Sequence, residues 1–238
     1  MGRVPRINRD AILRAAEHQA ADELTVPNLA KRMGVSVAAL YQHMRGQDEL
    51  LAWLGRCALT KLEVPSWGDL NWAEWLLAYA RELRTVLLRF PGALSYVSAR
   101  AQHSFEWLDQ AETVLAALIR AGFSDVEAEK TFLLIVDLVP GIVQREVGCA
   151  SAVRTLPHLR ELTVRGPTEL PVVLRLSRVA QAPGDEAFDE AVRTALAGVA
   201  LRRSELSVAQ AILSPRIAPH SPLKRRSATT PRRGRAKA

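Results

Sequence analysis

The sequence has very few cysteines and no long apolar run. Cys57 and Cys149 are the only cysteines among 238 residues, which excludes a disulfide framework and favours a reducing compartment. No stretch approaches the roughly 20 apolar residues that span a bilayer, because the most apolar run, residues 132–143, contains Asp137 and Pro140. The N-terminal residues have no apolar segment typical of a secretion signal. We therefore expect a cytoplasmic protein that does not bind membranes.

Catalytic and metal-binding patterns are also missing. The sequence has no nucleophile elbow, P-loop, HExxH or CxxC pattern, and no carboxylate pair at a suggestive spacing. Its five histidines do not cluster: His18, His43, His103, His158 and His220. A helical enzyme is the alternative that these absences disfavour. We expect neither catalysis nor a metal or other cofactor.

The excess positive charge lies at the C-terminal end. Eight Lys or Arg and no acidic residue follow Ser214, and without them the formal net charge of +7 falls to near −1. The high isoelectric point therefore says little about the rest of the chain. We expect residues 214–238, which also contain four prolines, to be a disordered basic tail. Such a tail either binds DNA phosphates in a salt-dependent way or is simply solvated.

Apolar residues recur at three- and four-residue steps along most of the chain, whereas β-hairpin signals are absent. This periodicity predicts an all-α fold. The expected helices begin at Asn8 or Asp10 and after Thr25, cover 37–43, 47–62, 72–90, 93–100 and 105–121, and resume after Ser124 and near Phe188. Residues 148–183 contain four prolines and are predicted to be irregular.

The most informative stretch is residues 24–51, LTVPNLAKRMGVSVAALYQHMRGQDELL. Thr25 is a good N-cap, Gly34 suits a left-handed corner, and Ser36 caps the short helix that follows. This spacing is typical of a helix-turn-helix, although an ordinary helical hairpin would also satisfy it. The second helix would expose residues that fit the major groove of DNA. In such a groove Gln42 suits adenine, and Ala38 and Ala39 suit thymine methyl groups.

The same stretch resembles the DNA-binding head of the tetracycline-repressor (TetR) family over some 45 contiguous residues, with Leu40-Tyr41-Gln42-His43 as the most specific element. The resemblance implies that the third helix enters the major groove and that the start of the fourth helix contacts a phosphate. We therefore predict a DNA-binding set of Thr25, Ser36, Val37, Ala38, Ala39, Tyr41, Gln42, His43, Arg45 and Gln47.

Two positions depart from the family pattern. Gln47 stands where a lysine is usual, which weakens the phosphate contact there, although Arg45 is close enough to replace it. Pro27 stands where the tetracycline repressor has a base-reading arginine, so the operator sequence should differ.

Further segments of the second half are residues 72–88, Pro91-Gly92-Ala93, Arg100, 118–124 and 188–200. They resemble, less specifically, the C-terminal domain of the tetracycline-repressor branch. The resemblance implies an effector pocket between helices and a dimer formed by the last two long helices, near residues 128–146 and 188–203. Aromatic walls with few polar groups are typical of ligand sites. The candidate lining residues are Trp75, Tyr79, Tyr96, Arg100, Gln102, His103, Trp107, Phe132, Asp137 and Gln144, although any of the aromatic ones could be simple core. Tyr96 falls where the family pattern places a magnesium-binding histidine, which disfavours a tetracycline chelate.

These observations predict three regions: a helix-turn-helix domain at 1–63, a helical ligand-binding and dimerisation domain at 64–213, and the tail at 214–238. The expected function is a homodimeric repressor that binds a palindromic double-stranded DNA operator and leaves it when an unknown small molecule binds. A transcriptional activator and a ligand-independent regulator of the same fold remain alternatives. A third is an architectural protein that binds DNA non-specifically through the tail.

Overall fold

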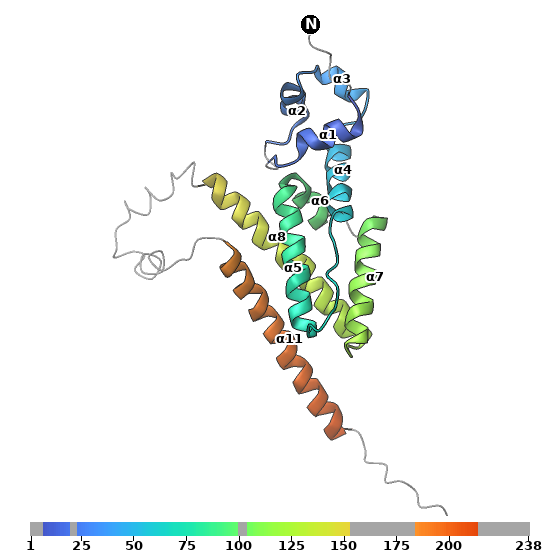
Figure 1. Cartoon of the computed structure of the whole chain (residues 1–238), viewed down its shortest axis with the longest axis vertical. Helices are drawn as coiled ribbons and strands as arrows, with labels where there is room; N and C mark the ends of the chain where they lie inside the picture. Colours follow the sequence, from blue (N-terminus) through green and yellow to red (C-terminus); the bar gives the residue numbers. More distant parts are fainter. Residues whose placement is uncertain (1–6, 20–22, 100–103, 153–183, 214–238) are drawn as a thin grey trace, which may run out of the picture. The chain divides into compact units, whose positions relative to one another are not determined.

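The computed structural model describes residues 7–19, 23–99, 104–152 and 184–213, and helices are the only regular elements within these ranges (Figure 1). In chain order they are α1 (Arg9–Ala16), α2 (Val26–Met33), α3 (Val37–Tyr41), α4 (Gln47–Thr60), α5 (Trp72–Arg89), the 3-10 turn η1 (Pro91–Ala93), α6 (Leu94–Ala99), α7 (Phe105–Arg120), α8 (Asp125–Ala152) and α11 (Asp185–Leu213). The predicted all-α fold is confirmed. Residues up to Val199 form one compact unit, and α11 from Ala200 onward belongs to a second.

Side-chain caps fix where several helices begin. The Asn8 side chain accepts a hydrogen bond from the backbone N–H of Ala11 at 2.8 Å and starts α1. Asn71 and Glu74 form a reciprocal capping box at the start of α5. The Ser104 hydroxyl caps α7 by accepting from the backbone N–H of Trp107 at 3.2 Å. Because the first N–H groups of a helix have no partner within it, these caps fix the helix register.

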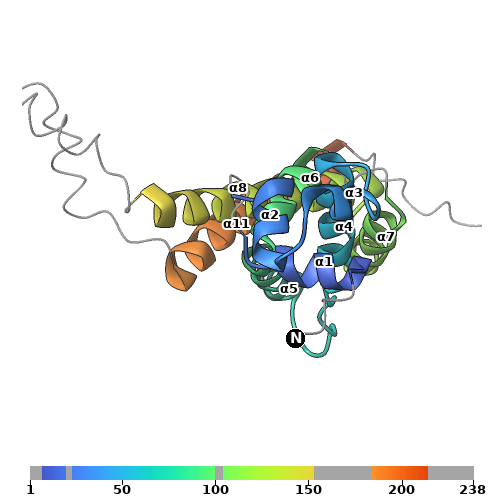
Figure 2. The same ribbon diagram turned by 90° about the horizontal axis from the view of Figure 1, so that it is seen from above.

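The first four helices lie together (Figure 2), with α2 packed on α1 and α3, and α4 packed on α1. Ile12, Leu29, Leu40 and Leu50 come from α1, α2, α3 and α4 in turn, and each is completely buried. The guanidinium of Arg9 lies 4.9 Å from the ring centre of Trp53, which adds a cation–π contact between α1 and α4. Each helix thus contributes at least one core side chain to a three-helix head set on α4.

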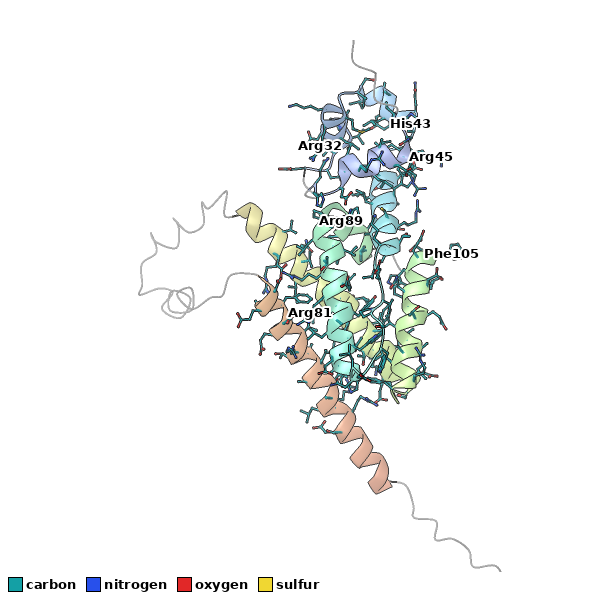
Figure 3. The ribbon with its side chains drawn as sticks, viewed as in Figure 1. Arg32, His43, Arg45, Arg81, Arg89 and Phe105 are labelled. Atoms are coloured by element: carbon teal, nitrogen blue, oxygen red, sulfur yellow. The ribbon has the colours of Figure 1, made fainter. Side chains whose placement is uncertain are left out.

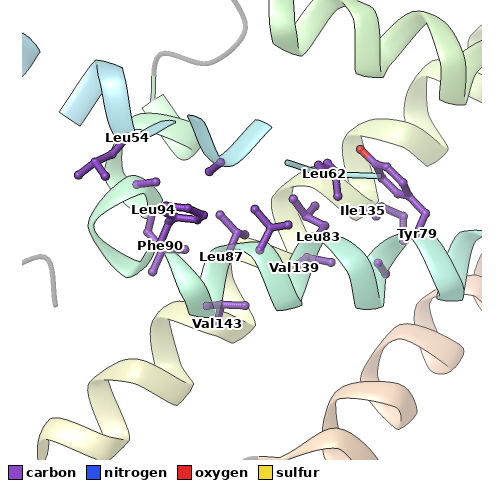
Figure 4. Packing of buried hydrophobic residues seen from close by; sticks show 14 of the residues in the cluster. Leu54, Leu62, Tyr79, Leu83, Leu87, Phe90, Leu94, Ile135, Val139 and Val143 are labelled. Carbon is purple, nitrogen blue, oxygen red and sulfur yellow. The ribbon is translucent and has the colours of Figure 1, made fainter. Parts of the chain in front are cut away.

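The same apolar core continues where α5 packs on α8, and α7 also packs on α8. Figure 4 shows Leu83 and Leu87 of α5 beside Ile135, Val139 and Val143 of α8. All five are buried apolar side chains, so this helix pair is held mainly by removal of apolar surface from water.

Two close contacts join the head to the helices that follow. The peptide N–H of His18, just after α1, donates to the Arg89 carbonyl at the end of α5 at 3.0 Å, and the Arg89 guanidinium pairs with Glu17. Further along, Gly55 of α4 lies directly against the ring of Tyr96 on α6. A side chain at position 55 would overlap that ring, so α4 and α6 approach closely only because residue 55 is glycine.

Ion pairs attach the first half of α11 to α5 and α8. Arg84 donates to Glu146 at 3.0 Å and to Asp185 at 2.7 Å, and its guanidinium lies 5.0 Å from the ring centre of Phe188. Arg81 forms a second pair with Asp189. Phe188 itself is buried, so these charges surround an apolar anchor.

Some predicted helix limits were wrong. The prediction that residues 148–183 are irregular fails at its start, because α8 continues to Ala152. Val147 packs against the core, and a single Gly148 costs a helix only about 1 kcal/mol. The remainder of that segment, residues 153–183, lies outside the described residues. The short helix predicted to reach His43 ends at Tyr41, with Gln42 as its C-cap. None of the helices in the described ranges is long and apolar enough to cross a bilayer.

Candidate functional site

The turn between α2 and α3 is fixed by two short-range features. Gly34 ends α2 in the left-handed conformation, with φ of 67°, and its N–H bonds to the carbonyls of Ala30 and Lys31. A residue with a side chain would be strained in that conformation. The Ser36 hydroxyl then accepts from the N–H of Ala39 at 3.1 Å and starts α3. The direction of α3 relative to α2 is therefore set by local backbone geometry.

Helix α3 has one buried side and one exposed side. Leu40 is completely buried, whereas Tyr41 is 53% exposed and Val37 is 37% exposed. Ala38, Gln42 and His43 are exposed as well, and Ala39 is half-buried. The structure therefore brings the predicted α3 residues together on one solvent-facing surface, here called the reading surface (residues 37–39 and 41–43).

Basic residues lie on and beside the reading surface. Figure 3 labels Arg32 on α2, and His43 and Arg45 on the turn between α3 and α4. All three side chains are exposed. Lys31 and Arg32 were not among the predicted contacts, although two adjacent basic residues ahead of the Gly34 turn were a visible signal. Both residues lie in the last turn of α2, where positive charge also stabilises the C-terminus of the helix.

Two residues that were predicted to contact DNA also stabilise the fold of the head. The half-buried Thr25 side chain caps α2 by accepting from the Asn28 N–H at 3.3 Å. The Gln47 amide donates to the Leu24 carbonyl, which ties the start of α4 to the residue before that cap. Gln47 therefore holds the head together at the position where the family pattern has a phosphate-binding lysine. Arg45 lies next to it, and its backbone N–H bonds to the Glu49 carboxylate at 2.6 Å.

A pocket of about 170 Å³ lies among α4, α5, α6, α7 and α8. Five of the predicted ligand residues line it, namely Tyr79, Trp107, Phe132, Asp137 and Gln144. The ring centres of Trp107 and Phe132 are 5.5 Å apart, so two aromatic side chains form one wall. Burial raises the pKa of the Tyr79 phenol, which keeps its proton at neutral pH.

The other five predicted ligand residues are placed differently. The Trp75 indole N–H donates to the Pro65 carbonyl at 2.9 Å, and its buried ring lies against Trp67 and Tyr79 in the core rather than along the pocket. Tyr96 packs on Gly55. Arg100, Gln102 and His103 lie outside the described residues. In the described part of the chain, no three His, Cys, Asp or Glu side chains are grouped so that they would hold a metal ion.

Sequence reasoning missed Gln110, the pocket residue with the most unusual surroundings. Its amide nitrogen donates to the Leu62 carbonyl at 2.9 Å, just beyond the end of α4. Its amide oxygen is buried and has no hydrogen-bond partner among the described residues. Gln110 follows Trp107 by three positions on α7, a spacing that puts both side chains on one helix face. That spacing was the available signal.

Helix α4 contributes to both regions. Leu50 and Leu54 belong to the apolar core that supports the head, and Leu59 and Leu62, near the other end of the helix, line the pocket. Val97 of α6 also lines the pocket, one residue after the Tyr96 ring that covers Gly55 of α4. Helix α4 is therefore packed against both the core of the head and the pocket.

Comparison with known proteins places the chain in a family. The profile described as "Bacterial regulatory proteins, tetR family" matches residues 9–54, and that described as "Tetracyclin repressor-like, C-terminal domain" matches residues 64–203. An HTH-type transcriptional regulator from Saccharopolyspora erythraea is 27% identical over 146 residues, which are 60% of this chain and 62% of that protein. The class A tetracycline repressor of transposon 1721 from Escherichia coli is 26% identical over 206 residues, 83% of this chain and 93% of its own length.

A solved structure supports the same fold. ActR, a TetR family protein from Streptomyces coelicolor determined in complex with actinorhodin, aligns with a TM-score of 0.58 and 22% identity, covering 82% of this chain and 96% of that one. The described helices, the two-sided α3 and the two profile matches agree, and the chain belongs to the tetracycline-repressor family of bacterial transcriptional regulators.

Proposed function

We propose that this protein is a homodimeric transcriptional repressor that binds a palindromic operator through α3 and is released when a small molecule binds the pocket. The observation that carries the proposal is the reading surface: a short helix anchored by buried Leu40 and presenting Tyr41, Gln42 and His43 to solvent. Such a helix fits the major groove, where base edges differ in their donors, acceptors and methyl groups. In this role Gln42 reads bases, and Tyr41 and His43 hold the backbone.

A dimer is part of the proposal because one short helix contacts only a few base pairs. Two copies related by a two-fold axis reach half-sites about 34–36 Å apart on one face of the duplex. Leu134 of α8 is 36% exposed. Nothing in the described residues lies within 4 Å of where a Cβ at Gly198 of α11 would be. Both features suit close packing against the same helices of a second copy.

Release requires that the effector bind one arrangement of the heads better than another, because a ligand shifts an equilibrium only through differential affinity. The pocket meets the head through α4, because Leu59 of α4 and Leu62 just beyond its end line the pocket. An effector that displaces these side chains tilts α4, and the two reading surfaces of the dimer then no longer match consecutive major grooves. ActR bound to actinorhodin, and the tetracycline repressor by its name, are relatives that support a small-molecule effector.

The three-region division of the chain stays part of this proposal: a head at 1–63, a pocket and dimerisation domain at 64–213, and the basic tail at 214–238, which lies outside the described residues. In this scheme the cytoplasm is the site of action, and the tail adds phosphate contacts without base specificity.

Replacement of Tyr41 or His43 by alanine tests the proposal. A single hydrogen bond contributes about 0.5–1.5 kcal/mol net and is lost from both half-sites, so operator affinity should fall by roughly tenfold or more. Fluorescence anisotropy with the DNA upstream of the protein's own gene measures it. Phe105→Ala is the matched control, because Phe105 is 84% exposed but belongs to α7. Unchanged affinity in both head variants would remove α3 from the DNA interface.

Two further measurements separate the alternatives. Random DNA titrated at the same salt concentration should bind far more weakly than the operator, whereas an architectural protein would bind both alike. Deletion of the gene should raise expression of a reporter placed behind the operator; a fall would identify an activator.

A further inference from the structure

We propose that the pocket binds a neutral or cationic aromatic molecule that carries an N–H or O–H donor, and that the amide oxygen of Gln110 accepts this hydrogen bond. The inference rests on the proposed role of the pocket as the effector site and adds the chemistry of the effector. Gln110 lines the pocket and also bonds to the carbonyl of Leu62, just beyond the end of α4. It therefore lies between the pocket and α4.

The orientation of the Gln110 amide is fixed by its partner. The Leu62 carbonyl only accepts hydrogen bonds, so the group 2.9 Å from it must be the amide nitrogen. The amide oxygen is then the other terminal atom, buried and without a partner among the described residues. A buried acceptor without a donor is unfavourable, and native proteins satisfy nearly all such groups. Because neighbouring atoms cover this oxygen, a ligand donor that enters the pocket satisfies it only once the side chains that cover it move.

The walls favour a flat apolar molecule. The rings of Trp107 and Phe132 form one side, and Leu59, Leu83 and Val136 are among the aliphatic neighbours. Aromatic ligands gain from offset or edge contacts with such rings. A space of about 170 Å³ suits a fused two-ring molecule, and a larger ligand would have to displace lining side chains.

The charge of the pocket disfavours anions. Asp137 is the single Asp, Glu, Lys or Arg among the described lining residues. The Tyr79 phenol remains protonated, because burial raises its pKa. Gln144 adds a neutral polar group. A carboxylate or phosphate ligand would meet a negative charge and no described lining cation, whereas an ammonium group would be attracted to Asp137.

The same geometry shows how such a ligand acts on the head. A ligand donor holds the oxygen of the Gln110 amide, while the nitrogen of that amide holds the Leu62 carbonyl two residues after α4 ends. Ligand, Gln110 and the end of α4 then form one hydrogen-bonded chain. Gln110 is in this sense a positioning residue for α4 as well as a ligand contact.

Isothermal titration calorimetry on the full chain without DNA tests the donor requirement. Indole and benzofuran have nearly the same shape, but only indole has an N–H donor. We expect indole to bind at least about tenfold more tightly. In Gln110→Leu this preference should disappear, whereas the control Gln144→Leu, also in the pocket, should retain it. The comparison in the unaltered protein needs no variant, so it stands even if Gln110→Leu does not fold.

A second pair of probes tests the charge. Tryptamine carries an ammonium group and indole-3-acetate a carboxylate on the same ring system, and we expect tryptamine to bind at least about tenfold more tightly. In Asp137→Asn the difference should shrink. Equal binding of indole and benzofuran, tighter binding of indole-3-acetate, or no binding of either heterocycle would overturn the inference. Because no DNA is present, the result is separate from operator release: a probe that binds in the pocket without lowering operator anisotropy would contradict the induction mechanism and leave the pocket chemistry standing.

Discussion

The reading surface and the pocket use their side chains in opposite ways. On the reading surface the exposed Tyr41 and His43 contribute little to the core, and one buried residue, Leu40, anchors α3. In the pocket, Tyr79 and Phe132 are lining residues and core residues at once. Function and stability are therefore separable on the reading surface and coupled in the pocket. A regulator of this design can change its operator by point substitution more easily than its effector.

The largest expected difference is between Phe132→Ala and Tyr41→Ala. Phe132 is 2% exposed, so its truncation leaves a cavity and should lower the free energy of unfolding by about 3–5 kcal/mol. Tyr41 is exposed, and its truncation should change stability by less than about 0.5 kcal/mol. Urea denaturation at one fixed protein concentration measures both. Similar losses in the two variants would contradict the separation.

A second test concerns the contact that couples the two regions. Gly55→Ala places a methyl group against the Tyr96 ring, and such overpacking typically costs about 1–3 kcal/mol. Thermal unfolding should show the loss, and effector response should weaken with it because α4 and α6 separate. Gly148→Ala is the matched control: nothing described lies within 4 Å of its Cβ, and alanine favours the helix. A Gly55→Ala protein as stable as this control would show that the close approach is unimportant.

Substitutions at Ser36 should affect both the stability of the head and operator binding, because Ser36 caps α3 next to the reading surface. Ser36→Ala removes the cap of α3 and should cost about 0.5–2 kcal/mol. Ser36→Asp keeps a capping oxygen and should retain stability, yet its charge faces the phosphates and should weaken operator binding. Chemical denaturation and anisotropy on the same samples give both numbers. Equal stability of the two variants would mean that the cap does not fix α3.

The smallest expected effect is a pH dependence in the pair between Arg81 and Asp189. The hydrogen bond from Arg81 lowers the pKa of the Asp189 carboxyl from its ordinary value of 3.8. The stabilisation is therefore present above that pH and is lost as the pH falls below it. Arg81 is half exposed, so Arg81→Met should cost less than about 1 kcal/mol at neutral pH and nothing in strong acid. Denaturation at several pH values measures the difference in free energy of unfolding between Arg81→Met and the unaltered protein. A difference that grows as the pH falls would contradict the prediction.

The predictable part of the molecule is the part governed by local rules. A glycine at position 34 and a serine at position 36 define the turn and the cap from neighbouring residues alone, and the structure has both. The pocket was predicted only in part, because its shape depends on which faces of distant helices meet. Trp75 is an aromatic residue of the kind that lines ligand pockets, but its indole N–H donates to the Pro65 carbonyl and its ring lies in the core. Gln110 looks like an ordinary helix residue until Leu62 is brought beside it.

Gln47 has a consequence for how the regulator responds to its ionic surroundings. A lysine at this position would release a counterion from each half-site on binding. The amide of Gln47 is uncharged and donates instead to the Leu24 carbonyl. Each phosphate contact contributes about 0.9 to the slope of log affinity against log salt concentration. If Arg45 does not replace that contact, operator occupancy should vary less when the cell gains or loses salt.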